Sequence, residues 1–115
     1  EAFHPQACDL YRQAQQHVIH NYVLAEWVAL AHVRRVPRAA ALQILVDLHG
    51  NPDYEVIWVD PALHHEAVNL LLTRNDKAYS LCDAVSFVLM RQRKLTEALT
   101  TDRHFEQEGF QRLLK

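Results

Sequence analysis

Apolar residues recur along this chain in two patterns, long stretches with helical spacing and short continuous runs between them. The helical stretches begin at proline, asparagine or serine, which favour the first turn or the cap of a helix. They predict helices over 5–16, 21–33, 37–50, 61–74 and 80–93, with Asn21 as the cap of the second. The short runs predict strands over 54–59, 97–101 and 111–114, and a brief apolar stretch also occurs at 18–19.

Short apolar strands that alternate with amphipathic helices are typical of the α/β class. Such strands build a mostly parallel sheet, because the helices supply the crossover connections and cover both faces. We therefore expect a three-layer α/β/α sandwich.

Length and composition limit the number of domains and the kind of partner that the chain can have. The 115 residues, half of them hydrophobic, suffice for a core, and we expect a single domain over residues 1–115. Twelve Lys and Arg residues against fourteen Asp and Glu residues give a net charge of −2, which does not indicate attraction of the whole molecule to nucleic acid or to an acidic membrane. No apolar run approaches the roughly 18 residues that cross a bilayer. The two widely separated cysteines, Cys8 and Cys82, indicate reduced thiols, so we expect a soluble cytoplasmic protein.

Three acidic residues stand in unusually apolar surroundings. Glu26 is the single polar residue in a stretch of ten. Asp83 falls in the first turn of the helix that Ser80 can cap, and Asp102 follows the strand predicted over 97–101. The carboxyl ends of strands are where α/β folds commonly hold their active sites.

Each of these carboxylates also has an ordinary structural explanation. Asp83 can complement the positive end of its helix, and Asp102 can cap the turn that follows it. Glu26 can pair with an arginine of a neighbouring segment. Taken jointly, three carboxylates set in apolar sequence could converge on one hard divalent cation, Mg2+ or Mn2+, which prefers oxygen ligands. The structural explanations stay open for each residue alone.

Three segments combine these acidic residues with a specific set of neighbours. They are NYVLAE at 21–26, KAYSLCDA at 77–84 and ALTTDRHF at 98–105, the last followed by Gly109 and Phe110. Together they resemble the PIN domain family, and most of all its bacterial toxin endoribonucleases of the virulence-associated protein C (VapC) type. The resemblance extends over essentially the whole chain and implies a PIN-like fold that hydrolyses RNA phosphodiester bonds with Mg2+ or Mn2+.

The resemblance also implies roles for individual residues. Glu26, Asp83 and Asp102 match the second, third and fourth acidic positions of the family's metal site, so they are expected to bind the cation and to be catalytic. The family's usual hydroxyl neighbours are matched by Ser80 and Thr101.

Basic and aromatic residues near the acidic positions are candidates for contacting RNA. Arg103 and His104 adjoin Asp102 and are expected to face substrate phosphates. Tyr79, in the loop before the fifth predicted helix, is the aromatic residue that we expect nearest to a ligand. Trp58 falls in a predicted strand and is expected in the core.

The chain departs from the family at its beginning. PIN domains start with a strand that ends in Asp, and this strand precedes the helix matched here by 5–16. The first acidic position and the central strand are thus missing from the sequence, which begins at Glu1. Because the loss of a central strand would leave backbone groups of its neighbours unpaired, we expect a protein trimmed relative to its family, or a strand supplied by another segment or chain.

The sequence, with this resemblance, predicts a metal-dependent endoribonuclease that is the toxin of a toxin-antitoxin pair. The family implies an RNA substrate, a homodimer and a small antitoxin protein as partners, and no association with a membrane. Two alternatives stay open. A catalytically inactive PIN-fold module that binds RNA or protein is favoured by the missing Asp. A phosphate-receiving signalling domain is disfavoured, since no acidic cluster lies near the amino terminus.

Overall fold

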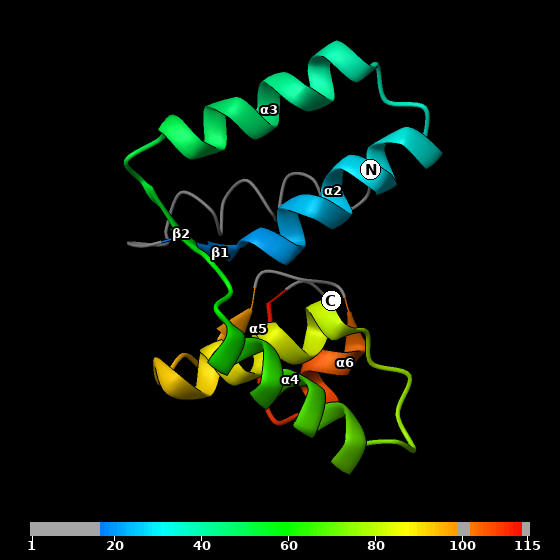
Figure 1. Cartoon of the computed structure of the whole chain (residues 1–115), viewed down its shortest axis with the longest axis vertical. Helices are drawn as coiled ribbons and strands as arrows, with labels where there is room; N and C mark the ends of the chain where they lie inside the picture. The colour runs from blue at the N-terminus through cyan, green and yellow to red at the C-terminus, as the bar shows by residue number, and fades with distance from the viewer. Residues whose placement is uncertain (1–16, 99–101, 114–115) are drawn as a thin grey trace. The chain divides into compact units, whose positions relative to one another are not determined.

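The computed structural model describes residues 17–98 and 102–113, and in it the chain divides into two compact units (Figure 1). We call them the N-terminal unit, Gln16–Val59, and the C-terminal unit, Asp60–Lys115. The helix predicted over 5–16 lies outside the described residues. The expectation of a single domain stays a prediction.

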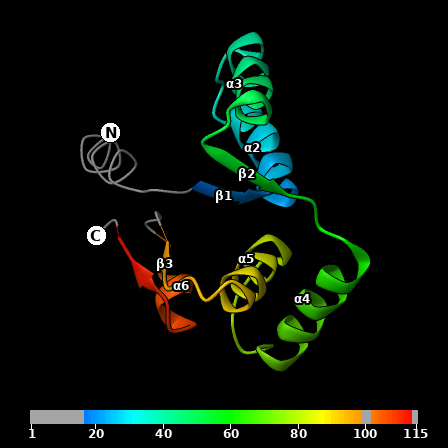
Figure 2. The ribbon, with the colours of Figure 1, turned by 90° about the vertical axis from the view of Figure 1, so that its left-hand side faces the viewer.

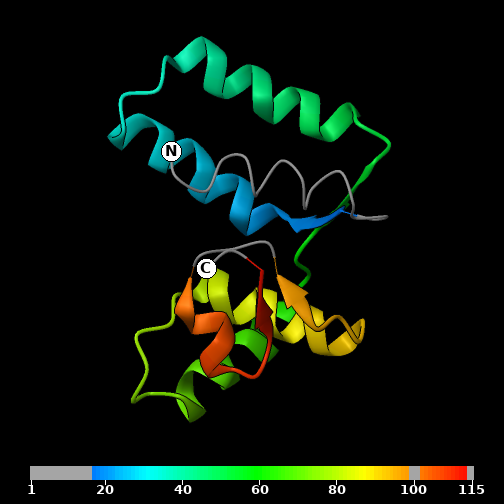
Figure 3. The same cartoon turned by 180° about the vertical axis from the view of Figure 1, so that it is seen from behind.

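In the N-terminal unit, two parallel strands are joined by two helices. β1 (His17–His20) pairs in parallel with β2 (Tyr54–Ile57), in register from end to end. Between them run α2 (Asn21–Val33) and α3 (Arg38–Gly50), which pack against each other as a helical hairpin (Figure 2, and from behind in Figure 3). Parallel strands need a crossover connection of about a dozen or more residues, and this hairpin provides it.

The first helix of this unit begins at a different cap from the predicted one. His20 has an extended backbone and caps α2 through its ring Nδ1, which accepts a hydrogen bond from the N–H of Val23 at 3.4 Å. Asn21 is the first helical residue, and its Oδ1 accepts a hydrogen bond from the backbone N–H of Val59 at 2.7 Å. The prediction of Asn21 as the cap is therefore wrong, because its side chain instead ties the segment after β2 to the start of α2.

The C-terminal unit contains two packed helices and a second pair of parallel strands. α4 (Pro61–Thr73) packs along α5 (Leu81–Gln92). β3 (Glu97–Ala98) pairs in parallel with β4 (Gln111–Arg112), and α6 (Arg103–Gln107) lies between them in the sequence.

The predicted class is confirmed, since helices alternate with short strands and both strand pairs in the described part of the chain are parallel. The strand predicted over 97–101 is described at Glu97–Ala98, and the rest of it lies outside the described residues. Within residues 17–98 and 102–113, no helix has both the length and the hydrophobicity to cross a bilayer.

Phe87 on α5 forms the centre of the core of the C-terminal unit and is fully buried. Its ring meets those of Tyr79, Phe105 and Phe110 at centroid distances of 5.1, 4.9 and 5.8 Å. Tyr79, predicted to be the aromatic residue nearest to a ligand, is thus part of the core. The expectation that Trp58 lies in the core is wrong, because β2 ends one residue before it and its side chain is exposed.

A buried carboxylate links several elements of the C-terminal unit. The side chain of Glu108 is only 2% exposed, and its two oxygens accept hydrogen bonds from Arg74 Nε and Arg91 Nη2, each at 2.7 Å. Burial disfavours the charged carboxylate, but the hydrogen bonds from Arg91 and Arg74 outweigh burial and hold the pKa of Glu108 below its ordinary value. Burial, followed by the effect of Glu108, raises the pKa of Tyr79 to about 12. One carboxylate therefore fastens the end of α4, the end of α5 and the segment after α6.

Replacing this carboxylate by an amide is expected to destabilise the fold. Glu108→Gln should lower the free energy of unfolding by about 2 kcal/mol at neutral pH. Breaking a buried ion pair costs about 3 to 5 kcal/mol, and we reduce that figure because both guanidiniums remain partly in contact with water. The folded-state pKa of Glu108 is lowered from 4.5, so the contribution of its charge is complete above that value and is lost as the pH falls through the folded pKa.

Urea unfolding of the wild type and of Glu108→Gln, at neutral pH and at about pH 3, measures this contribution. The difference between them should shrink as the pH falls toward the folded pKa of Glu108, because the protonated carboxyl group resembles Gln. Glu97→Gln, at an exposed position on β3, is the matched control and should change the stability by less than about 0.5 kcal/mol. A difference of the same size at both pH values would contradict the assignment of the stabilisation to the charge of Glu108.

Candidate metal centre

The start of α5 fixes the orientation of the first predicted site residue. Ser80 Oγ accepts a hydrogen bond from the backbone N–H of Asp83, and Asp83 Oδ2 accepts one from the backbone N–H of Ser80, each at 3.0 Å. This reciprocal arrangement is a capping box, which satisfies two donors at the helix start. The prediction that Ser80 caps this helix is confirmed, and so is the interpretation of Asp83 as a carboxylate of the first turn.

Asp102 has a similar position at the start of α6. Its Oδ1 accepts a hydrogen bond from the backbone N–H of His104 at 2.9 Å, so it caps the helix as the sequence predicted. The same turn brings the ring of His104 close to this carboxylate, with Nδ1 3.4 Å from Oδ1. The cap thus places an imidazole beside the carboxylate that begins the helix.

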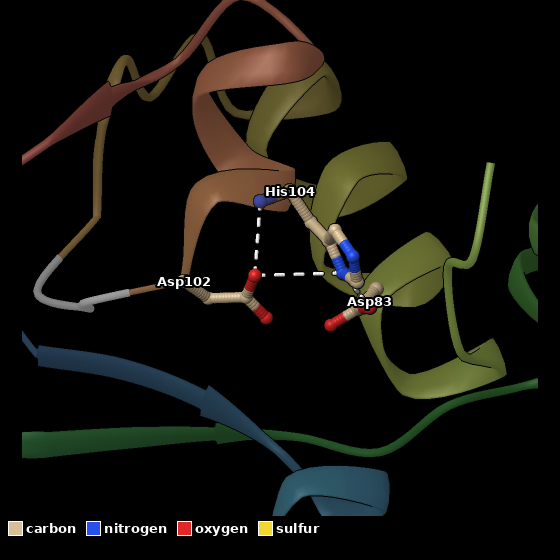
Figure 4. A group of neighbouring side chains, drawn as sticks. All are labelled: Asp83, Asp102 and His104. Carbon is tan, nitrogen blue, oxygen red and sulfur yellow. Dashed lines mark hydrogen bonds and ion pairs between the residues drawn. The ribbon is translucent and has the colours of Figure 1, made fainter.

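Asp83, Asp102 and His104 come together in one cluster (Figure 4). His104 Nδ1 lies 3.0 Å from Asp83 Oδ2, and each of the three residues offers one ligand atom within 4.8 Å of the others. The side chains of Asp83, Asp102 and His104 are 17, 41 and 29% exposed. The cluster is therefore partly shielded from water and still open to an ion.

The donor atoms of this cluster suit a divalent cation. Two carboxylates provide the hard oxygen ligands that Mg2+ and Mn2+ prefer, and imidazole is a common ligand of transition metals. Within residues 17–98 and 102–113, this is the one group of three acidic, histidine or cysteine side chains with ligand atoms so close together. The cluster could therefore hold a metal ion.

The structure does not place the remaining predicted site residues in this cluster. Glu26 lies on α2 in the N-terminal unit, where its side chain is exposed, and its role as a ligand stays a prediction. Arg103 is exposed on α6, directly after Asp102, and its predicted contact with RNA phosphate is untested. Thr101 lies outside the described residues.

Two features near the cluster were not anticipated from the sequence. His104 was expected to face substrate phosphates, whereas its ring contacts two carboxylates. The sequence did contain a signal that His104 lies beside Asp102. A residue two positions after a helix cap often donates its backbone N–H to the side chain of the cap. Glu108 gave no local signal, since its partners Arg74 and Arg91 lie 34 and 17 residues away in the sequence.

Comparison with known proteins bears on the fold. No family model and no curated protein matches the chain. Among solved structures, the chain is similar to the crystal structure of VapC20 from Mycobacterium tuberculosis, described as a toxin that cleaves the sarcin-ricin loop. The TM-score is 0.85 at 29% sequence identity, over 96% of this chain and 84% of that one. The chain has a PIN fold of the VapC type. The resemblance predicted from the three sequence segments is thereby confirmed.

We expect a divalent cation to stabilise this VapC-type domain through the cluster. Mn2+ at about a hundred times its Kd should raise the free energy of unfolding by about 2.7 kcal/mol, because a ligand that binds only the folded state stabilises it. Asp83→Asn and Asp102→Asn should each remove most of this gain, since each takes away a charged oxygen ligand. Urea unfolding with and without Mn2+ measures the effect.

The matched control is Asp76→Asn, which removes an exposed carboxylate from the same unit outside the cluster. This variant should keep the full stabilisation by Mn2+. Equal stabilisation in all four proteins would show that Mn2+ acts elsewhere on the chain.

Proposed function

We propose that this chain is a metal-dependent endoribonuclease that hydrolyses RNA phosphodiester bonds, and that it is the toxin of a toxin-antitoxin pair. The observation that carries the proposal is the convergence of Asp83, Asp102 and His104, with ligand atoms within 4.8 Å of one another, in a VapC-type fold. Its neighbour VapC20 is described as a toxin that cleaves the sarcin-ricin loop.

In this proposal, Asp83 and Asp102 hold Mg2+ or Mn2+, and Glu26 is a further ligand on the strength of the family resemblance. A bound divalent cation polarises a phosphoryl oxygen and lowers the pKa of a bound water, so that hydroxide becomes available near neutral pH. The chain itself supplies carboxylates whose orientation is set before RNA arrives, because Asp102 caps α6 and Asp83 completes the capping box of α5. Preset orientation lowers the free energy that must be spent on arranging ligands during the reaction.

Arg103, directly after Asp102, is proposed to bind the RNA backbone. Arg103 is exposed on α6 and carries a permanent positive charge, which suits a phosphate group. By the family resemblance, Thr101 and Ser80 are proposed as hydroxyl neighbours of the metal site. With a net charge of −2 for the whole chain, attraction to RNA must come from such local positive groups and from the bound cation.

The proposed partners follow from the family. A small antitoxin protein that neutralises the toxin, and a second copy of the chain in a homodimer, are the expected protein partners. The proposed setting is the cytoplasm. The similarity to VapC20, which is described as a toxin, supports this part of the proposal.

A catalytically inactive PIN-fold module that binds RNA or protein is the second candidate. It is favoured by the structural roles that both carboxylates already have, Asp102 as the cap of α6 and Asp83 in the capping box of α5, with His104 as a hydrogen-bond partner. A cluster held together in this way does not require a cation for its geometry.

RNA cleavage distinguishes the two candidates. The chain should cut single-stranded or structured RNA in Mn2+ or Mg2+ and lose the activity in EDTA. Asp102→Asn should lower the rate by about 100-fold or more, because stabilisation of transition-state charge by a metal amounts to several kcal/mol. Labelled RNA followed by gel electrophoresis measures both effects.

Asp76→Asn again serves as the control and should cut RNA at the wild-type rate. Cleavage that persists unchanged in Asp102→Asn would point to a contaminating nuclease. An inactive wild-type chain that still binds RNA would favour the binding module.

A further inference from the structure

The ring of His104 is held from three sides. Its Nδ1 is 3.0 Å from Asp83 Oδ2 and 3.4 Å from Asp102 Oδ1 (Figure 4). On another side, the ring of Tyr79 packs against it edge to face, with centroids 5.1 Å apart and planes at 67°. Tyr79 is itself buried against Phe87, so the hydrophobic core sets the plane of the imidazole.

The contact with Asp83 determines which ring nitrogen carries a proton. An ionised carboxylate only accepts hydrogen bonds, so Nδ1 must donate to Asp83 Oδ2. A protonated ring nitrogen has no lone pair to offer to a metal ion. In this arrangement, His104 acts on Asp83 and is not itself a ligand through Nδ1.

The hydrogen bonds that Asp83 accepts from residues within 17–98 and 102–113 fall on one of its two oxygens. Oδ2 accepts from the backbone N–H of Ser80 at 3.0 Å and from His104 Nδ1 at 3.0 Å. Two donors from different elements, one before α5 and one on α6, therefore fix the rotation of the carboxylate. They leave Oδ1 as the oxygen that can bind a cation.

We propose that His104 is a positioning residue of the metal site. It holds Asp83 Oδ2 through Nδ1–H, so that Oδ1 stays available to a divalent cation, and Tyr79 holds the ring of His104 in place. This inference rests on the proposed function, and it differs from the sequence-based expectation that His104 contacts RNA phosphate. Groups that orient a ligand residue in this way contribute about 10 to 100-fold to metal affinity in other proteins.

Three substitutions at this position test the inference through Mn2+ affinity. His104→Ala removes the donor and should raise the Kd for Mn2+ by about tenfold or more. The amide nitrogen of Asn can reach the place of Nδ1, whereas that of Gln extends to the place of Nε2. His104→Asn should therefore recover most of the affinity, and His104→Gln should not. Titration of free Mn2+ by electron paramagnetic resonance measures the Kd without any reaction.

RNA cleavage by the same variants separates positioning from a direct contact with substrate. Cleavage by His104→Ala should be weak at low Mn2+ and should recover at saturating Mn2+, with the KM for RNA unchanged. A KM for RNA that stays raised at saturating Mn2+ would instead support the phosphate contact and overturn the positioning role. Pulsed electron paramagnetic resonance of bound Mn2+ should show no coordinated histidine nitrogen in the wild type, and such a signal would also overturn it.

The outcomes distinguish this inference from the proposed function. A wild-type chain that binds Mn2+ and cuts RNA, with His104→Ala and His104→Gln equal to it in Mn2+ affinity, would refute the positioning role alone. A wild-type chain that neither binds Mn2+ nor cuts RNA would refute both. Urea unfolding of each variant without metal checks that a lost affinity does not arise from a lost fold.

Discussion

A carboxylate that is removed from water must find its counter-charges within the protein, and Glu108 finds them on two helices. Arg74 follows α4 and Arg91 lies in the last turn of α5, so both guanidiniums come from helix ends. Cations are favourable at helix C-termini, and Glu108 draws the segment after α6 toward them. This placement carries the chain into β4, which pairs with β3. The position of α6 and of its cap Asp102 therefore depends on a residue outside the metal cluster.

Tyr79 connects this ion-pair network to the cluster. One side chain lies beside Glu108, packs on Phe87 and packs on His104. Burial and the nearby carboxylate keep its hydroxyl protonated throughout the physiological pH range, so no charge develops beneath the site. Core packing and site geometry consequently share one residue, and a change in the core is transmitted to the imidazole by direct contact.

Much of this fold could be predicted from local sequence, because helix starts and ends leave chemical signals. Ser80 and Asp102 each lie where a side-chain oxygen can satisfy free N–H groups, and both predictions are confirmed. Local sequence could not show whether His20 or Asn21 caps α2, since both side chains can accept a hydrogen bond. The choice depends on Val59, which lies 38 residues from Asn21 and donates to it. Trp58 was misplaced because a strand pattern does not say at which residue the ladder stops.

The candidate site was only partly predictable. The acidic residues could be named because apolar surroundings and a family pattern marked them. The direction of the His104 ring could not be predicted, since it depends on contacts with Tyr79 and Asp83, which are 25 and 21 positions away in the sequence. The convergence of Asp83 and Asp102 likewise depends on the packing that brings α6 beside α5. Contacts of this kind are set by tertiary structure and leave no mark in neighbouring sequence.

Both clustered carboxylates hold helix starts through a single side-chain oxygen, and an amide oxygen can accept the same hydrogen bonds. At the N-cap position, which Asp102 occupies, Asn is as good as Asp. A one-step exchange of Asp for Asn at either position would therefore discard the negative charge and keep the architecture. A single substitution can therefore remove the proposed metal site from this fold while the protein stays folded, so stable variants without that site are easily reached by mutation.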